Sequence, residues 1–233
     1  MKNLKVIISG GGTGGHIFPA IAIAKAIENK VQNVEFLFVG AEDRMEMEKV
    51  PAAGYKIIGL WISGLQRKLD KRNLLFPFKV IHSIFKAKNI VKEFKPDLAI
   101  GTGGYASAPL LYAAAKKGIP TVIQEQNSYP GITNRILAKH VQKICVAYDE
   151  MERFFPTEKL IITGNPIREG ILDFNNKVTD GQVKFNIDKT KPTVLVVGGS
   201  LGALTINNAI AENINQIKNM DVNLIWQTGI SYQ

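Results

Sequence analysis

Residues 4–16 read LKVIISGGGTGGH, an apolar run followed at once by a glycine-rich turn. The same arrangement recurs twice, where residues 98–105 read LAIGTGGY and residues 194–202 read VLVVGGSLG. Glycine allows a tight turn and the close approach of a ligand to the main chain. The helix that follows each turn directs free N–H groups at that ligand. Three such turns after strands predict a cleft that binds phosphates and hydroxyl groups.

Short apolar runs alternate with helical patterns along the chain, as is typical of an open α/β sheet with right-handed crossovers. The expected strands are 4–9, 34–39, 55–58, 97–101, 121–123, 143–147, 160–163, 193–197 and 222–226. The expected helices are 19–29, 76–94, 106–117, 132–140 and 204–217. Pro19 is expected in the first turn of its helix, where its missing N–H costs nothing.

The pattern predicts two domains. Residues 1–165 form the first, residues 166–191 are a linker, and residues 192–233 begin a second α/β unit that stops after strand, helix and strand. Two strands leave much of their sheet uncovered. We therefore expect the chain to end within its second domain.

Composition narrows the possible settings and partners. The chain has 233 residues, 45% of them hydrophobic, and it contains neither an apolar run of about 18 residues nor a signal peptide. The single cysteine, Cys145, excludes a disulfide framework, so a cytoplasmic setting is expected. The net charge is +9, and residues 1–165 carry 23 basic against 14 acidic residues. This imbalance predicts an anionic partner: nucleic acid, acidic lipid or a phosphorylated substrate.

The basic excess is combined with apolar side chains between residues 61 and 92. The cluster consists of Leu75, Phe76 and Phe78 beside Arg67, Lys68, Lys71, Arg72 and Lys79. Such a patch favours insertion of apolar groups among lipid headgroups, with the cations on anionic lipid. A core helix with one solvated face is the alternative. A nucleic-acid surface is disfavoured, because no helix-turn-helix, zinc or RNP pattern accompanies the charge.

The first glycine-rich turn matches a dinucleotide-binding fold only in part, and the histidine that follows it has two possible roles. Gly10, Gly12 and Gly15 fit the spacing of dinucleotide-binding folds, but the second strand ends at Gly40 without the acidic residue that those folds need. His16 stands at the helix start, where an imidazole can accept a proton from a hydroxyl group or simply cap the helix.

Polar residues also follow the strand at 121–123, where residues 124–127 read QEQN. They form either a hydrogen-bonding rim of the cleft or a turn with an asparagine cap. Tyr105 either offers its hydroxyl group to a sugar or phosphate, or packs as an aromatic ring. His82 and His140 are expected to be solvated or structural.

Five motifs, taken in order, resemble those of the MurG family, the UDP-N-acetylglucosamine transferases that convert lipid I to lipid II in peptidoglycan synthesis. They are GGTGGH at 11–16, GGY at 103–105, EQN at 125–127, GNPIR at 164–168 and VGGSLGA at 197–203. DRME at 43–46 and ISGL at 62–65 match the family pattern as well. The resemblance extends from Leu4 to Gly229.

The resemblance implies an α/β GT-B fold, with two Rossmann-like doubly wound domains of which the second is incomplete here. It implies inverting transfer of N-acetylglucosamine from UDP-GlcNAc to the C4 hydroxyl group of MurNAc-pentapeptide in lipid I. Either His16, the first choice, or Glu125 would be the general base. The implied donor contacts are Thr13, Gly14, Gly15, Asn127, Arg168 and Ser200, and the implied acceptor side is Gly103, Gly104 and Tyr105.

The implied partners are UDP-GlcNAc, lipid I, anionic inner-membrane lipid and cell-wall synthesis proteins, with the protein peripheral on the cytoplasmic face of the cell membrane. No DxD motif is present, so neither a metal ion nor another cofactor is expected, and nucleic acid is not an expected partner. Two alternatives remain. One is another GT-B enzyme, such as a UDP-sugar epimerase or a different lipid-linked glycosyltransferase, and the other is an inactive membrane-docking fragment.

Overall fold

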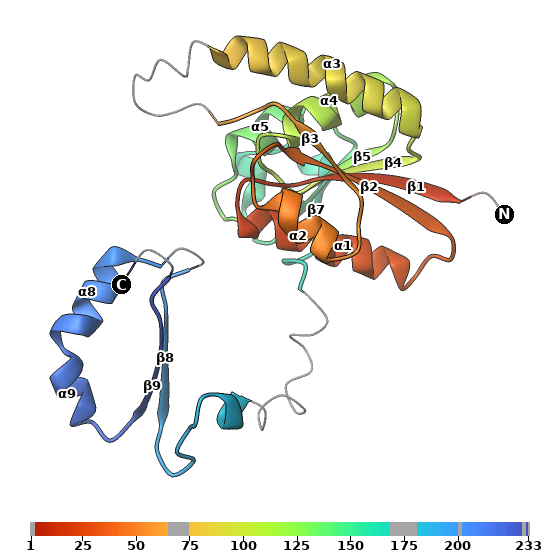
Figure 1. The fold of residues 1–233 in the computed structure, drawn as a ribbon. Helices are drawn as coiled ribbons and strands as arrows, with labels where there is room; N and C mark the ends of the chain where they lie inside the picture. Colours follow the sequence, from red (N-terminus) through yellow and green to blue (C-terminus); the bar gives the residue numbers. More distant parts are fainter. Residues whose placement is uncertain (1–2, 65–74, 168–180, 200–201, 230–231, 233) are drawn as a thin grey trace. The chain divides into compact units, whose positions relative to one another are not determined.

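The computed structural model describes residues 3–64, 75–167, 181–199, 202–229 and 232. The chain forms two compact units, Met1–Arg168 and Glu169–Gln233 (Figure 1). Each unit has its own sheet, and the two are treated in turn.

The described part of the first unit contains a seven-stranded, wholly parallel sheet in the order β3-β2-β1-β4-β5-β6-β7. Every predicted strand of this unit is confirmed, with ends displaced by two residues at most. The strand order reverses between β1 and β4, the kind of switch point where open α/β sheets bind ligands. The strands are β1 (Leu4–Ser9), β2 (Val34–Ala41), β3 (Ile57–Leu60), β4 (Leu98–Gly101), β5 (Thr121–Glu125), β6 (Lys143–Val146) and β7 (Leu160–Ile162).

Helices cover both faces of this sheet. One face carries α1 (Gly14–Glu28) and α2 (Glu46–Ala52), and the other carries α3 (Phe76–Phe94), α4 (Ser107–Lys116) and α5 (Ile132–Leu137) (Figure 1). Two short 3₁₀ turns, Met151–Arg153 and Thr157–Lys159, precede β7. Ile7 and Ile8 are neighbours in β1 but belong to different core clusters, because successive strand side chains point to opposite faces. Burial on both faces explains why the strands read as apolar runs.

The start of α1 differs from the sequence prediction. The helix begins at Gly14, so Pro19 lies inside it rather than in its first turn. The N–H groups of His16 and Ile17 both donate to the carbonyl oxygen of Thr13, at 3.1 and 3.2 Å. The prediction was wrong because the glycine-rich stretch itself makes the first helical turn. Pro19 removes the hydrogen bond that its N–H would have made to the carbonyl of Gly15.

Two glycine-rich turns meet at the switch point: the first glycine turn (residues 10–15), after β1, and the second glycine turn (residues 101–105), after β4. The N–H of Gly11 donates to the carbonyl oxygen of Gly103 at 3.2 Å. Gly104 has a φ of +89°, and a Cβ atom on it would overlap the main chain of Gly11. The two turns therefore interlock through main-chain contacts that only glycine allows.

The second unit pairs β8 (Thr193–Val197) in parallel with β9 (Asn223–Gln227), as predicted to within one residue. The predicted helix 204–217 is divided into α8 (Leu204–Glu212) and α9 (Ile214–Lys218). The division falls at Asn213. Its side-chain amide donates to the carbonyl of Ala209 at 2.9 Å, and its main-chain N–H donates to the carbonyl of Ile210. Such side-chain competition for main-chain groups interrupts helices.

We expect residues 1–168 to fold without the rest of the chain, since both core clusters lie within them. Each unit contains one tryptophan, Trp61 or Trp226. Urea unfolding followed by Trp61 emission is expected to give the same midpoint in a 1–168 fragment and in the whole chain carrying Trp226→Phe. A midpoint about 1 M lower in the fragment would show that the first unit depends on the second.

The interlocking of the glycine turns predicts unequal effects of two alanine substitutions. Gly118 also has a positive φ, +73°, but a Cβ atom there would meet no neighbouring atom within 4 Å. Gly118→Ala is expected to lower the free energy of unfolding by about 1 kcal/mol, the cost of the left-handed conformation. Gly104→Ala is expected to lower it by about 3 kcal/mol or more, because the overlap with Gly11 adds to that cost. Equal losses in urea unfolding would contradict the interlock.

Candidate functional site

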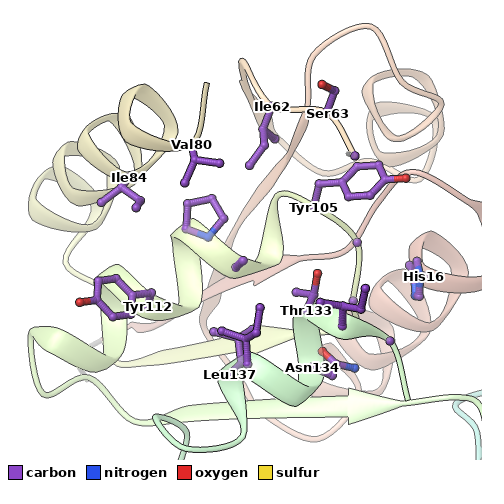
Figure 2. Close-up of a pocket in the computed structure, with 18 of the residues that line it drawn as sticks. His16, Ile62, Ser63, Val80, Ile84, Tyr105, Tyr112, Thr133, Asn134 and Leu137 are labelled. Carbon is purple, nitrogen blue, oxygen red and sulfur yellow. The ribbon is translucent and has the colours of Figure 1, made fainter. Parts of the chain in front are cut away.

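A cavity of about 810 Å³ opens in the first unit beside the carboxyl ends of β1, β4 and β5. His16 and Tyr105 lie toward one end of it, whereas Ile84 and Tyr112 lie toward the other (Figure 2). The volume is that of a typical small-molecule site. The remaining lining residues are Ile62, Ser63, Gly64, Phe76, Val80, Gly103, Gly104, Ala108, Pro109, Glu125, Gly131, Ile132, Thr133, Asn134, Ile136, Leu137 and His140.

The imidazole ring of His16 is held in one orientation. Its Nδ1 lies 2.8 Å from the carbonyl oxygen of Thr102 and 3.0 Å from Oε1 of Gln126. The amide orientation of Gln126 is fixed in turn, because its Nε2 donates to the carbonyls of Thr102 and Gln124 at 3.0 and 3.1 Å. Two acceptors at Nδ1 place the ring hydrogen there, which leaves Nε2 of the neutral ring as the basic atom. The sequence predicted the position of His16 but not this tautomer.

Glu125 holds the loop between β5 and the start of α5 in place. Its side chain is 1% exposed and accepts four hydrogen bonds. Oε1 accepts from the main-chain N–H and side-chain amide of Asn127 at 3.1 and 3.0 Å, and Oε2 accepts from the N–H of Gly131 and the side chain of Asn134 at 3.1 and 2.9 Å. Both carboxylate oxygens are therefore engaged in positioning this rim of the cavity.

Glu46, a buried glutamate on α2, holds the first glycine turn in place through a hydrogen bond. Its carboxylate accepts the N–H of Gly12 at 3.0 Å and the N–H of Ala41 at 2.9 Å. Cβ atoms on Gly11 or Gly40 would overlap it. Sequence reasoning noted Glu46 only within the DRME segment and missed this role, because its partner in the turn is 34 positions away. Gly11 and Gly40, which leave space for this side chain, were the sequence signal that could have indicated the role.

Tyr105 lies at the mouth of the cavity with 43% of its surface exposed. Its ring packs across Gly64, where a Cβ atom would overlap it, and its Cε2 would lie 3.6 Å from a Cβ atom on Gly12. The ring is thus packed on one side and open on the other. Thr13, at the N-cap of α1, makes no capping hydrogen bond through its side chain.

Asn165, in the GNPIR motif, is also brought to the rim of the sheet. Its side chain accepts from Nε2 of Gln124 and donates to the carbonyl of Gln126, both at 3.3 Å. Gly14 and Gly15 form the start of α1, and Asn127 is exposed in the loop after β5. Other predicted site residues, Arg168, Ser200, Arg67, Lys68, Lys71 and Arg72, lie outside the described residues.

The remaining members of the predicted membrane patch lie at the start of α3 and differ in exposure. Leu75 and Phe78 are 49% and 66% exposed, whereas Phe76 is half-buried and lines the cavity. Lys79 donates to the hydroxyl of Ser63 at 3.2 Å and lies 5.4 Å from the ring centre of Trp61.

The other two histidines contact aromatic rings edge to face. The ring centres of His82 and Trp61 are 5.7 Å apart, and those of His140 and Tyr112 are 5.4 Å apart. His140 also lines the far end of the cavity.

Two searches of the described residues gave negative results. In the described ranges, no group of three or more His, Cys, Asp or Glu side chains is placed to hold a metal ion. None of the helices built from described residues is long and apolar enough to cross a bilayer.

Comparison with known proteins identifies the family. Residues 6–146 match the glycosyltransferase family 28 N-terminal domain. The chain is 58% identical over 231 residues to a protein of Cytophaga hutchinsonii and 55% identical over 231 residues to one of Christiangramia forsetii. Both are named UDP-N-acetylglucosamine–N-acetylmuramyl-(pentapeptide) pyrophosphoryl-undecaprenol N-acetylglucosamine transferase. These matches cover 99% of this chain and 63% of each relative, so the chain spans less than two thirds of their length.

Solved structures agree with the predicted fold class. The crystal structure of Acinetobacter baumannii MurG matches with a TM-score of 0.70 and 28% identity, over 98% of this chain and 62% of that one. A UDP-GlcNAc 2-epimerase from Neisseria meningitidis, bound to UDP-GlcNAc, matches with a TM-score of 0.64 over 99% of this chain and 66% of that one; at 14% identity, it shares the fold alone. The predicted GT-B class, with two Rossmann-like units, is confirmed. With most of its first unit matched by the family's N-terminal domain, the chain belongs to glycosyltransferase family 28.

Proposed function

We propose that this chain is part of an enzyme that transfers N-acetylglucosamine from UDP-GlcNAc to the C4 hydroxyl group of MurNAc in lipid I, giving lipid II for peptidoglycan synthesis. The observation that carries the proposal is the orientation of His16 at the switch point, with Nε2 left as the basic atom. The names of the relatives supply the donor and acceptor.

In the proposed reaction, Nε2 of His16 accepts the proton of the acceptor's C4 hydroxyl group as that oxygen attacks the anomeric carbon of the donor sugar. The new glycosidic bond forms on the face opposite the departing UDP, so the configuration at this carbon is inverted. The hydrogen bond from Nδ1 to the carbonyl of Thr102 holds the ring in place and stabilises the imidazolium that forms.

The first glycine turn is proposed to bind the anionic part of a substrate. The N–H groups of Gly14 and Gly15 have no partner within the helix that they begin, and the positive end of the helix dipole lies there. We assign Thr13, Gly14, Gly15 and Asn127 to the donor, together with Arg168 and Ser200. The second glycine turn with Tyr105 is assigned to the acceptor.

Glu125 is the weaker candidate for the base. Its two oxygens already accept three hydrogen bonds from the loop that follows β5 and one from Asn134 on α5, and a carboxylate that left this network would lose all four. We therefore assign Glu125 a positioning role at the rim of the site.

The outer side of α3 is proposed to lie on the membrane. Phe78, Ile81 and Phe85 are 66%, 54% and 61% exposed, which is unusual for three large apolar groups on one helix. Lys79 and Lys88 lie on the same helix. Apolar groups among the headgroups and cations on anionic lipid would hold the protein peripherally, on the cytoplasmic face where lipid I is proposed to be used.

Replacement of His16 tests the proposed base. Because the chain spans 63% of its relatives, the assay uses a chimera completed with the unmatched part of the Cytophaga hutchinsonii protein. His16→Ala is expected to lower kcat by about 10²–10⁴-fold, since proton transfer is lost. Product is measured by mass spectrometry with UDP-GlcNAc and a lipid I analogue.

His82→Ala is the matched control, because His82 is exposed on α3 and belongs to no proposed step. It should keep the parent kcat. A change in kcat below about threefold in His16→Ala would remove His16 from the role of base. Absence of product from the unmutated chimera would contradict the proposed function itself.

Vesicle binding tests the membrane face. Leu75→Ser combined with Phe78→Ser is expected to weaken binding to phosphatidylglycerol vesicles by about tenfold or more, because two exposed apolar side chains leave the headgroup region. Ile162→Ser, at an isoleucine 65% exposed on β7, is the control and should bind like the parent. Unchanged sedimentation of the double variant at low salt would exclude this face.

A further inference from the structure

We propose that the apolar end of the 810 Å³ cavity binds the first isoprene units of the acceptor, those next to its diphosphate. The identity of the ligand rests on the proposed function. The position of the subsite rests on the arrangement of α3, α4 and α5.

One stripe of α3 is covered along only half of its length. Positions 76, 80, 84, 87 and 91 recur at helical spacing and so share a face. Ala87 and Val91, in the C-terminal half, are fully buried in the core with α4. Phe76, Val80 and Ile84, in the N-terminal half, are half-buried and line the cavity. The stripe that seals the core at one end of α3 thus continues as the wall of an open pocket at the other.

The opposite walls are mainly apolar, and His140 also lines this end. Pro109 and Tyr112 come from α4, and Ile132 and Ile136 come from α5. Ile132 and Ile136 are 76% and 58% exposed, so the core leaves much of their surface uncovered. Figure 2 shows Val80 and Ile84 on α3 above Tyr112 and Leu137 on the other two helices. Apolar surface of this extent in water marks a binding site.

The two ends of the cavity together select the acceptor. Its polar end holds His16, the second glycine turn and Glu125, where the reacting hydroxyl group must come. A ligand that fills both ends needs a polar head joined to a hydrocarbon chain. In the proposed reaction the donor is polar throughout, and only the acceptor has such a chain.

The surroundings favour an isoprenoid that continues into a bilayer. The cavity has room for only a few isoprene units, so the rest of a long chain must leave it. Val80 and Ile84 face the cavity, whereas Ile81 and Phe85, one position further along the same helix, are exposed on the outer side that we propose to lie on lipid. A chain passing α3 therefore moves from one apolar environment to another.

Binding of soluble probes to the 233-residue chain tests the subsite. Calorimetry compares farnesyl diphosphate with inorganic diphosphate, which share the anionic head. We expect farnesyl diphosphate to bind at least about tenfold more tightly, because its hydrocarbon enters the apolar end. Ile136→Asn and Ile84→Asn should abolish most of this difference and leave binding of inorganic diphosphate unchanged. Ile162→Asn, at a similarly exposed isoleucine on β7, should behave as the parent.

Three results would overturn the proposal. The first is equal affinity of the parent for the two probes. The second is displacement of farnesyl diphosphate by lysophosphatidylglycerol at matched concentration, which would assign the pocket to phospholipid chains. The third is a dimer that Ile136→Asn dissociates in sedimentation, which would assign it to a second copy. Because Ile136 is more than half exposed, its replacement tests the pocket without endangering the fold.

Turnover by the chimera separates this proposal from the proposed function. Two acceptors are compared, one with an isoprenoid diphosphate and one in which a methyl group replaces the isoprenoid. Ile136→Asn is expected to raise KM about tenfold for the isoprenoid acceptor and to leave KM for the methyl acceptor unchanged. Equal effects on both acceptors would reject the subsite alone. Absence of product from both acceptors in the parent chimera would reject the function.

Discussion

The contact between the two glycine turns is the constraint on which the site depends. The hydrogen bond from Gly11 to Gly103, and the approach of Gly104 to the main chain of Gly11, join the ends of β1 and β4 at the point where the strand order reverses. A side chain at Gly104 would push these ends apart. Because His16 follows one turn and its acceptor Thr102 lies in the other, the orientation of the imidazole depends on this contact.

Polar side chains then fix the groups that the two glycine turns bring together. Glu46 holds the first glycine turn through Gly12, and Gln126 holds His16 while its own amide is fixed by neighbouring carbonyls. Glu125 organises the loop that closes the same rim. Each of these side chains forms hydrogen bonds with main-chain donors or acceptors near the site. The polar end of the cavity is thus preorganised, as the proposed proton transfer to His16 requires.

Helix α3 contributes to three environments. Its C-terminal half completes the core, its N-terminal half walls the apolar end of the cavity, and its outer side exposes Phe78, Ile81 and Phe85. The sequence left two interpretations of 76–94 open, a membrane patch and a core helix with one solvated face. Neither included a cavity wall, which arises because α3 and α4 pack closely where Ala87 removes side-chain bulk, but leave a space where Val80 and Ile84 line the cavity. Helical spacing in the sequence shows which residues share a face of α3, but not what packs against that face.

The sequence by itself determined the strands, the glycine turns and the helices that follow them, because apolar runs, turn residues and helical spacing are local signals. The motif order also determined the family. Only the tertiary structure decided the tautomer of His16, the role of Glu46 and the existence of the cavity. Their contacts join residues 34, 86 and 110 positions apart, and no local pattern specifies such distances. Pro19 illustrates the limit. Its local preference predicts a place in the first helical turn, but α1 begins five residues earlier, in the glycine turn that Gly103 and Glu46 hold in place.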